Sequence, residues 1–213
     1  MNTSDLKKVI FSAAKSMNKM LRLARSKQVR YAEGKYFALL AHMSVLGCAA
    51  EDGSNTMNLL DEVPSSDSLL RELQKLSVFD VEEQFNNVFD KQFRKMFGKK
   101  KRKVIAIVDV HEQETYTKSK KTHRAVRGGK HKNGTNYFFK YVSIQLLDGA
   151  GRVATLRVKL FTRNDTLHEV VAQLVRAAAR RAKIRVILLD RGFRDARIMN
   201  DLEWLGIPLL MPS

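Results

Sequence analysis

The sequence has little of what secreted and membrane-embedded proteins use. Its 213 residues include one cysteine, Cys48, which cannot form a disulfide within the chain or build a cysteine-based zinc cluster. No apolar run reaches the length of about eighteen residues that a membrane span needs, because His42 interrupts the longest candidate, Phe37 to Ala50. The first residues, MNTSDLKK, also lack the apolar segment of a secretory signal. We therefore expect a protein of the reducing cytoplasm, with no membrane partner.

Acidic residues are also scarce relative to basic ones. The chain has 22 Asp and Glu against 39 Lys and Arg, which gives a net charge of +17, while 44% hydrophobic residues are enough for a globular core. The excess is concentrated between Lys91 and Lys140, where sixteen basic residues stand against three acidic ones. Such a concentration predicts a polyanion as partner, with binding that depends strongly on salt.

The residues before Gly98 show apolar positions at helical spacing and no strand pattern. We interpret residues 1–98 as a helical, DNA-binding domain, with a turn cluster at Glu51–Asn55. A helix-turn-helix is predicted at about residues 56–76, with Ser66, Ser68 and Arg71 facing a DNA groove. The helices are expected at about residues 6–27, 32–50, 56–62, 67–75 and 81–96.

After Gly98 the pattern changes to that of an α/β or α+β domain, expected over residues 99–213. Five consecutive basic residues, Lys99–Lys103, form the boundary between the domains. Uninterrupted β-branched runs predict buried strands, and Asp148–Gly151 predicts a hairpin loop. The expected order is β-β-β-α-β-α-β, with strands at residues 104–108, 137–147, 152–161, 186–189 and 207–211, and helices at 165–182 and 195–205.

Two of the buried-type strands each end in an aspartate, Asp109 and Asp190. If the strands are neighbours, both carboxylates face one site, and such oxygens suit Mg²⁺ or Mn²⁺ acting on a phosphodiester. The alternative is that each aspartate only caps the turn that follows. His111 polarises a water or touches a phosphate in one interpretation and makes a backbone hydrogen bond in the other. His42, Trp204 and the phenylalanines are interpreted as core.

Several basic residues are predicted to contact double-stranded DNA. The segment Arg127-Gly128-Gly129-Lys130 suggests a loop whose backbone amides approach a phosphate, although it lacks the spacing of a Walker motif. The predicted DNA-binding residues are Lys99, Lys100, Lys101, Arg102, Arg127, Lys130, Lys132 and Arg71.

Two strings of residues resemble the catalytic domain of insertion-sequence transposases of the DDE class. The first runs from Ile107-Val108-Asp109-Val110-His111-Glu112 through Tyr116 and Arg127–Lys130 to Lys132–Phe138. The second is Leu188-Leu189-Asp190-Arg191-Gly192-Phe193, followed by a helix and Gly206–Pro212. The resemblance covers about residues 103–213. It is specific because both strings occur in the family's order, with the expected strands and helix between them.

The resemblance implies a ribonuclease-H-like mixed sheet with Asp109 on its first strand and Asp190 on its fourth. These residues would bind two divalent metals, Mg²⁺ or Mn²⁺, for DNA strand cleavage and strand transfer between element ends and target. It also implies a nucleoid-associated protein that forms a homo-oligomer on DNA. The family's third carboxylate, a glutamate on a helix beyond the fifth strand, has no counterpart here, since Glu203 precedes that strand. The expectation is a C-terminally truncated, catalytically incomplete domain.

Two other classes remain open. One is a non-catalytic DNA-binding remnant or regulator of transposition, which would keep the same basic surface. The other is an α/β phosphotransferase or nuclease, which would usually carry a second aspartate where His111 stands or a phosphate-binding loop.

Overall fold

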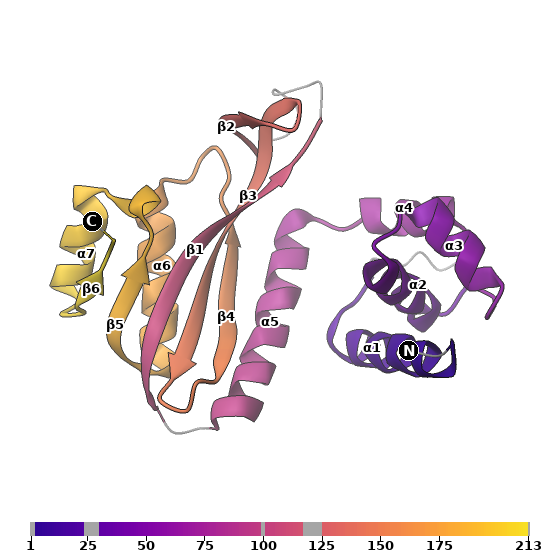
Figure 1. Cartoon of the computed structure of the whole chain (residues 1–213), viewed down its shortest axis with the longest axis horizontal. Coiled ribbons are helices and arrows are strands. Elements are labelled where there is room, and N and C mark those ends of the chain that lie inside the picture. The colour runs from indigo at the N-terminus through magenta and orange to yellow at the C-terminus, as the bar shows by residue number, and fades with distance from the viewer. Residues whose placement is uncertain (1–2, 24–29, 99–100, 117–124, 213) are drawn as a thin grey trace. The chain divides into compact units, whose positions relative to one another are not determined.

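Helical spacing in the first part of the chain and β-branched runs in the second lead to two separate compact units, Met1–Val88 and Phe89–Ser213. The computed structural model describes residues 3–23, 30–98, 101–116 and 125–212 (Figure 1). Within these ranges, no helix is both long and apolar enough to cross a bilayer.

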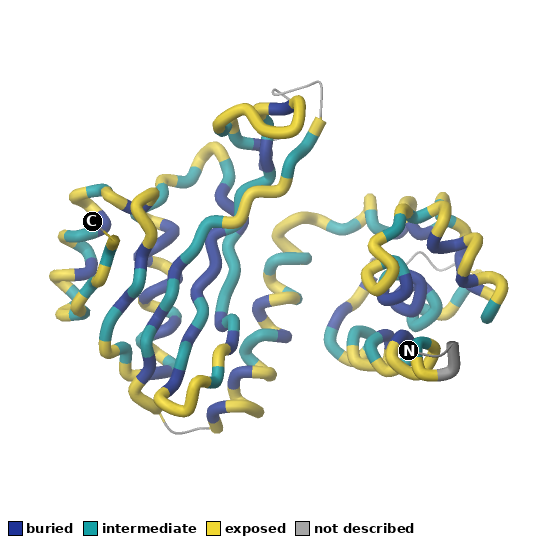
Figure 2. Tube along the Cα trace, in the orientation of Figure 1, coloured by how far each residue is buried: buried dark blue, intermediate teal, exposed yellow. Residues whose placement is uncertain are grey.

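The first unit packs its helices around a buried central one. Its elements are α1 (Thr3–Met20), α2 (Glu33–Leu46), α3 (Ala50–Asn58), α4 (Ser66–Gln74) and the first part of α5 (Val78–Phe97). Helix α2 buries Tyr36, Phe37 and Leu39 almost completely, as its nearly uniform apolar sequence predicts (Figure 2). It ends at Gly47, whose left-handed φ of 64° lets the backbone turn back onto the helix.

Three of the expected helix boundaries are wrong. The helix expected to reach about residue 50 ends at Leu46, because Gly47 caps it. Helix α1 ends at Met20 instead of continuing to about residue 27, although residues 24–29 lie outside the described ranges. The predicted turn cluster at residues 51–55 lies inside α3. The cluster resembles a turn in the sequence because it contains Gly53. In the structure this glycine instead allows close helix packing, since a Cβ at this position would collide with the side chain of Met43 on α2. The expected helix at 56–62 is therefore the end of α3.

The start of α4 follows the prediction. Ser65 is its N-cap, and its hydroxyl accepts a hydrogen bond from the backbone N–H of Ser68 at 3.3 Å. The connection from α3 occupies residues 59–65, which is longer than the three to four residues typical of a helix-turn-helix. The Ser68 hydroxyl lies 2.9 Å from the Tyr36 hydroxyl of α2, whereas Arg71 is exposed.

The second unit has the sheet topology that the sequence predicts. The strands are β1 (Lys103–Glu114), β2 (Val126–Lys132), β3 (Thr135–Asp148), β4 (Val153–Leu160), β5 (Lys183–Leu189) and β6 (Leu209–Leu210). Strands β1, β3 and β4 are antiparallel neighbours, and β5 and then β6 run parallel to β1. Helices α6 (Leu167–Arg181) and α7 (Ala196–Trp204) connect β4 to β5 and β5 to β6. This is a ribonuclease-H-like arrangement, with β2 as an additional strand.

The core of this unit lies between the sheet and its helices. Val104, Ala106 and Val108 of β1 are almost fully buried, while the residues between them are half-buried. Helix α6 packs against β3, β4 and β5. Phe93 and Phe97, from the second half of α5, belong to the same core. For this reason the boundary between the two compact units falls within α5, between Val88 and Phe89, and not at the lysine run.

Strand β2 was not expected, because two glycines and three basic residues mask its strand character. It pairs with the first residues of β3, with a bulge between Gly128 and Lys132. Gly129 lies against the Phe138 ring, which a Cβ would approach to 2.8 Å. Asn133 and Gly134 turn the chain into β3 with φ angles of 47° and 79°, the left-handed region that a tight hairpin requires. The predicted phosphate-binding loop is therefore a strand.

Some aromatic residues predicted as core lie on the surface. Trp204 is 82% exposed and Phe79 66% exposed. Both occupy helix positions that point away from their cores, and such positions cannot be distinguished from the composition of the helix. The prediction is confirmed for Phe37, Phe93, Phe97, Phe138, Phe161 and Phe193, which are buried.

We expect His42 to make the helical unit less stable below neutral pH. Its Nε2 lies 2.9 Å from the Thr56 hydroxyl, which donates to the carbonyl of Asp52, so Nε2 is the donor in this contact. Its Nδ1 is buried and has no hydrogen-bond partner among the residues that the structure describes, and burial lowers the pKa of His42 below 6.5. The unfolded chain therefore binds a proton more readily than the folded one. The contribution of neutral His42 is present above pH 6.5 and is lost as the pH falls, at up to about 1.4 kcal/mol per pH unit.

Denaturant unfolding between pH 7.5 and 5 measures this effect. The variant His42→Gln should flatten the decline in the free energy of unfolding, and the exposed control His131→Gln should not. Equal pH dependence in both variants would contradict the assignment.

Candidate functional site

The parallel pairing of β1 with β5 brings the two predicted aspartates together. Val108 of β1 is the register partner of Leu189 of β5, and each is followed directly by an aspartate, Asp109 and Asp190. Asp190 directly follows β5, at the carboxyl end of that parallel strand, where such sheets place ligand-binding residues. The expectation that the first strand ends at Asp109 is wrong, because β1 continues to Glu114 and Asp109 lies inside it. The expectation that the two strands are neighbours is confirmed, and each aspartate follows a member of the Val108–Leu189 pair.

Asp109 is held by its own strand and faces a histidine and a serine. Its Oδ1 accepts a hydrogen bond from the backbone N–H of Val110 at 2.8 Å, and its Oδ2 lies 3.8 Å from Nε2 of His111. The same Nε2 lies 3.0 Å from the Ser143 hydroxyl. Ser143 is the cross-strand partner of Asp109 on β3 and is buried. His111 thus contacts side chains rather than a backbone group, and Asp109 keeps about half of its side chain exposed.

Asp190 is both a cap and an available ligand. It is the N-cap of the short 3-10 helix η1 (Arg191–Phe193), and its Oδ1 accepts a hydrogen bond from the backbone N–H of Gly192. The capping interpretation is therefore correct for one oxygen. Asp190 is exposed, so its second oxygen can face a ligand at the sheet edge.

The donor set fits a divalent cation in part. Carboxylate oxygens are the ligands that Mg²⁺ and Mn²⁺ prefer, and here one carboxylate lies on β1 and the other directly follows the adjacent strand β5. Within the described ranges, no group of three or more His, Cys, Asp and Glu side chains is close enough to hold a metal. Glu112 pairs with Lys140 at 2.5 Å.

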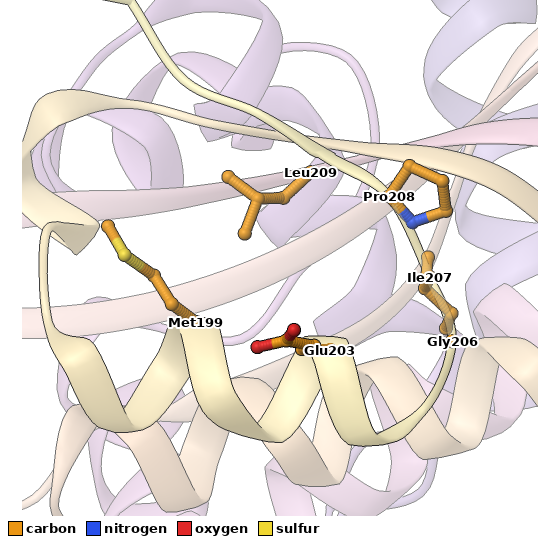
Figure 3. Close-up of a pocket in the computed structure, with 6 residues that line it drawn as sticks. All are labelled: Met199, Glu203, Gly206, Ile207, Pro208 and Leu209. Atoms are coloured by element: carbon orange, nitrogen blue, oxygen red, sulfur yellow. The ribbon is translucent and has the colours of Figure 1, made fainter.

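Glu203 lies away from the two aspartates. It belongs to the last turn of α7, a helix that starts beyond the carboxyl end of β5 and runs back along the sheet. It lines a pocket of about 400 Å³ together with Met199, Gly206, Ile207, Pro208 and Leu209. Figure 3 shows these six residues on α7 and on the segment that leads into β6.

Some of the predicted DNA-binding residues have structural contacts. Lys99 and Lys100 lie outside the described ranges. Lys101 donates to the carbonyl of Ala179 at 3.2 Å, and Arg102 to the carbonyl of Phe97 at 2.9 Å.

Arg127 holds β2 to the loop that follows β4. Its guanidinium donates to the carbonyl oxygens of Thr162 and Asp165 and lies 3.8 Å from the centre of the Phe161 ring. Burial lowers the pKa of this guanidinium. In return, Arg163 donates to the carbonyl of Val126 at 2.7 Å. Arg127 is therefore a structural residue of the hairpin base.

Lys130 and Lys132 lie near the tip of the β2–β3 hairpin, where both are exposed. Lys132 forms a surface ion pair with Glu114 at 3.4 Å, which costs little to break. Arg71 is exposed at the end of α4 in the other unit.

Sequence reasoning missed two parts of this edge. Ser143 has no motif, and only the strand register reveals that it lies opposite Asp109. Arg191 and Arg194 follow Asp190 closely and are exposed. Their proximity to Asp190 in the sequence is a signal that could have identified them.

Comparison with known proteins gives distant likenesses to solved structures. No protein-family model matches the chain, and no curated protein matches its sequence. The piggyBac transposase synaptic complex with hairpin DNA is 13% identical, with a TM-score of 0.49, over 98% of this chain and 48% of that one. The Drosophila P element transposase strand transfer complex is 11% identical, with a TM-score of 0.40, over 96% of this chain and 42% of that one.

A third solved structure, the Mos1 transposase paired-end complex with left transposon end, is 13% identical, with a TM-score of 0.27, over 89% of this chain and 61% of that one. This chain thus spans less than two thirds of the length of each of these three proteins. At these identities the likeness concerns the fold alone.

We expect Gly192→Ala to weaken Mn²⁺ binding, because a Cβ at this position would lie 3.0 Å from Oδ1 of Asp190 and displace that carboxylate. Gly149 is the control, since a Cβ there meets nothing within 4 Å. Calorimetric titration with Mn²⁺ should show a several-fold loss of affinity for Gly192→Ala alone. If both variants bind as the unmodified chain does, Asp190 does not hold the cation.

Proposed function

We propose that Phe89–Ser213 is the catalytic domain of a DDE-class transposase of the insertion-sequence type, which acts on DNA phosphodiesters with Mg²⁺ or Mn²⁺. The observation that carries this proposal is the Val108–Leu189 register, which aligns Asp109 and Asp190 on adjacent central strands. The basic charge of the chain supports a nucleic acid as the substrate.

Asp109 and Asp190 are the proposed metal ligands. These two carboxylates would hold divalent cations, which would supply electrostatic stabilisation of the attacking and leaving oxygens of a phosphodiester. The Val110 and Gly192 backbone N–H groups orient one oxygen of each aspartate. Ser143 anchors His111 beside Asp109, so that the imidazole borders the proposed site without occupying a ligand position.

A complete two-metal site needs more than two carboxylates, because each ion takes about six ligands. We infer that the described residues supply part of the site and that DNA cleavage requires a further carboxylate. The alternative function, a DNA-binding protein that regulates transposition without catalysis, shares the same basic surface and is distinguished by metal binding.

The β2–β3 hairpin is the proposed DNA contact of this domain. A two-stranded ribbon fits the major groove, and Lys130 and Lys132 lie on β2 directly before the Asn133–Gly134 turn at its tip. In the helical unit, the exposed Arg71 at the end of α4 is the proposed phosphate contact. The basic run at the start of this domain is also proposed to contact DNA phosphates because of its charge, through Lys99, Lys100, Lys101 and Arg102. The proposed partner is double-stranded DNA of element ends and target, bound by a homo-oligomer.

We expect Asp109→Asn and Asp190→Asn each to reduce Mn²⁺ affinity at least tenfold while leaving DNA affinity nearly unchanged. Each substitution removes a charged ligand of the metal ion. It leaves unchanged the basic side chains that phosphates can contact. Isothermal titration with Mn²⁺ and fluorescence anisotropy with a short DNA duplex measure the two quantities. Asp201→Asn, a partly exposed aspartate in the middle of α7, is the matched control.

Three outcomes are informative here. Unchanged Mn²⁺ binding in both variants would overturn the metal site, and DNA binding without any Mn²⁺ binding would favour the regulator. The chain alone is expected to nick DNA negligibly in Mn²⁺. Efficient nicking that depends on Asp190 would show that the carboxylate set is already complete.

We expect Lys130→Ala/Lys132→Ala to reduce the slope of log affinity against log salt by about two units, since each phosphate contact contributes about 0.9. Arg71→Ala should reduce it by about one unit. The control Arg180→Ala/Arg185→Ala removes two exposed charges next to the amino end of β5, at the opposite edge of the sheet. Loss of slope in the control, or none in the hairpin variant, would exclude the hairpin as a DNA contact.

A further inference from the structure

We propose that Arg191 and Arg194 form a phosphate clamp beside Asp190, which holds the DNA backbone next to the reacting phosphodiester. This inference rests on the proposed function and names two residues that contact the substrate of the same site. Both residues belong to the segment that leaves the sheet edge after β5, with Arg191 in η1 and Arg194 as its C-cap.

The first argument is the contrast with seven arginines of this unit that have structural partners. Arg157 and Arg181 pair with the half-buried Asp90 at 3.4 and 2.8 Å, and Arg152 pairs with the buried Asp148 at 2.6 Å. Others donate to backbone carbonyl groups or pair locally, namely Arg102, Arg127, Arg163 and Arg197.

Arg191 and Arg194 differ from this set. Both are exposed, and across the described ranges neither guanidinium has a hydrogen bond or an ion pair with another side chain. The fold therefore does not account for them, and their charge is available to a ligand.

The nearest carboxylate after Asp190 is already engaged. Asp195 caps α7 and pairs with Arg197 at 2.9 Å. The hydrogen bond from Arg197 is the main cause that lowers the pKa of Asp195 to about 2. Asp195 and Arg197 thus satisfy each other, and the positive charge of Arg191 and Arg194 is not neutralised within the segment.

The second argument is electrostatic. A phosphodiester is an anion, and it must approach an edge that presents Asp109 and Asp190. Cations that flank these carboxylates reduce the repulsion and raise the rate of encounter. Guanidinium groups also bind phosphate oxygens in a bidentate manner, which orients the backbone as well as attracting it.

The local backbone fixes the position of both residues in the turn that follows Asp190. The Arg194 N–H donates to the carbonyl of Arg191 at 3.2 Å, which closes the turn that Asp190 caps. Between them, Phe193 is buried in the core and anchors the turn to the sheet. The two arginines therefore rise from a short, anchored segment, and each lies within four residues of Asp190 in the chain.

The test compares three double variants of the full chain on a blunt random-sequence duplex. Arg191→Ala/Arg194→Ala should lower the slope of log affinity against log salt by about two units. Arg191→Lys/Arg194→Lys keeps the charges and should retain the slope. Arg180→Ala/Arg185→Ala, which removes two equally exposed arginines at the opposite sheet edge, should leave the slope unchanged.

Mn²⁺ titration of the same variants provides the second readout. The affinity for Mn²⁺ should stay within about twofold in all three variants, because none of them removes a proposed metal ligand. An unchanged Mn²⁺ affinity also shows that the turn at Asp190 is intact. An unchanged slope for Arg191→Ala/Arg194→Ala in a chain that binds the duplex would overturn the clamp and leave the proposed function standing. Absence of duplex binding by the unmodified chain would overturn both.

Discussion

The parallel pairing of β1 with β5 is the constraint on which the rest of the sheet unit depends. Its register sets Val108 against Leu189, and the next residue on each strand is an aspartate. A slip of one residue would move one aspartate off the edge and reverse the faces of its strand. The buried alternation of Val104, Ala106 and Val108 opposes such a slip, since the same residues form the core. Core packing and site geometry are thus two results of one register.

Charge has two separate uses in this unit. Asp90 of α5 pairs with Arg157 of β4 and Arg181 of α6, and Asp148 of β3 pairs with Arg152 in the turn before β4. A buried pair of this kind is costly to break from one side. Other basic residues, at the hairpin tip and after Asp190, are exposed and contribute little to stability. Only the structure separates the two groups, because a count of basic residues treats Arg127 and Lys130 alike although one supports the hairpin and the other faces solvent.

The order of strands and helices along the chain could be predicted from the sequence, because buried β-branched runs and capped helices have local signals. The pairing of β1 with β5, which aligns Asp109 with Asp190, was expected only from the resemblance to the transposase domain, since local patterns do not show which strands are neighbours. The α3 helix and β2 could not be predicted. Gly53 and Gly129 look like turn residues, and each is instead required by a neighbouring side chain, Met43 or Phe138, that is distant in the chain. The exposure of Trp204 was missed for the same reason, since burial depends on what packs against a helix.

Strand β6 is an edge strand of the sheet. It pairs with β5 through Leu209 and Leu210, and among the described residues no strand pairs with its other side. Leu210 is 62% exposed there, and Trp204 on the preceding helix is also exposed. An unpaired edge beside apolar side chains favours association between copies, which a net charge of +17 opposes through mutual repulsion. Because salt screens that repulsion and strengthens apolar contacts, we expect the colloidal stability of this protein to fall as ionic strength rises.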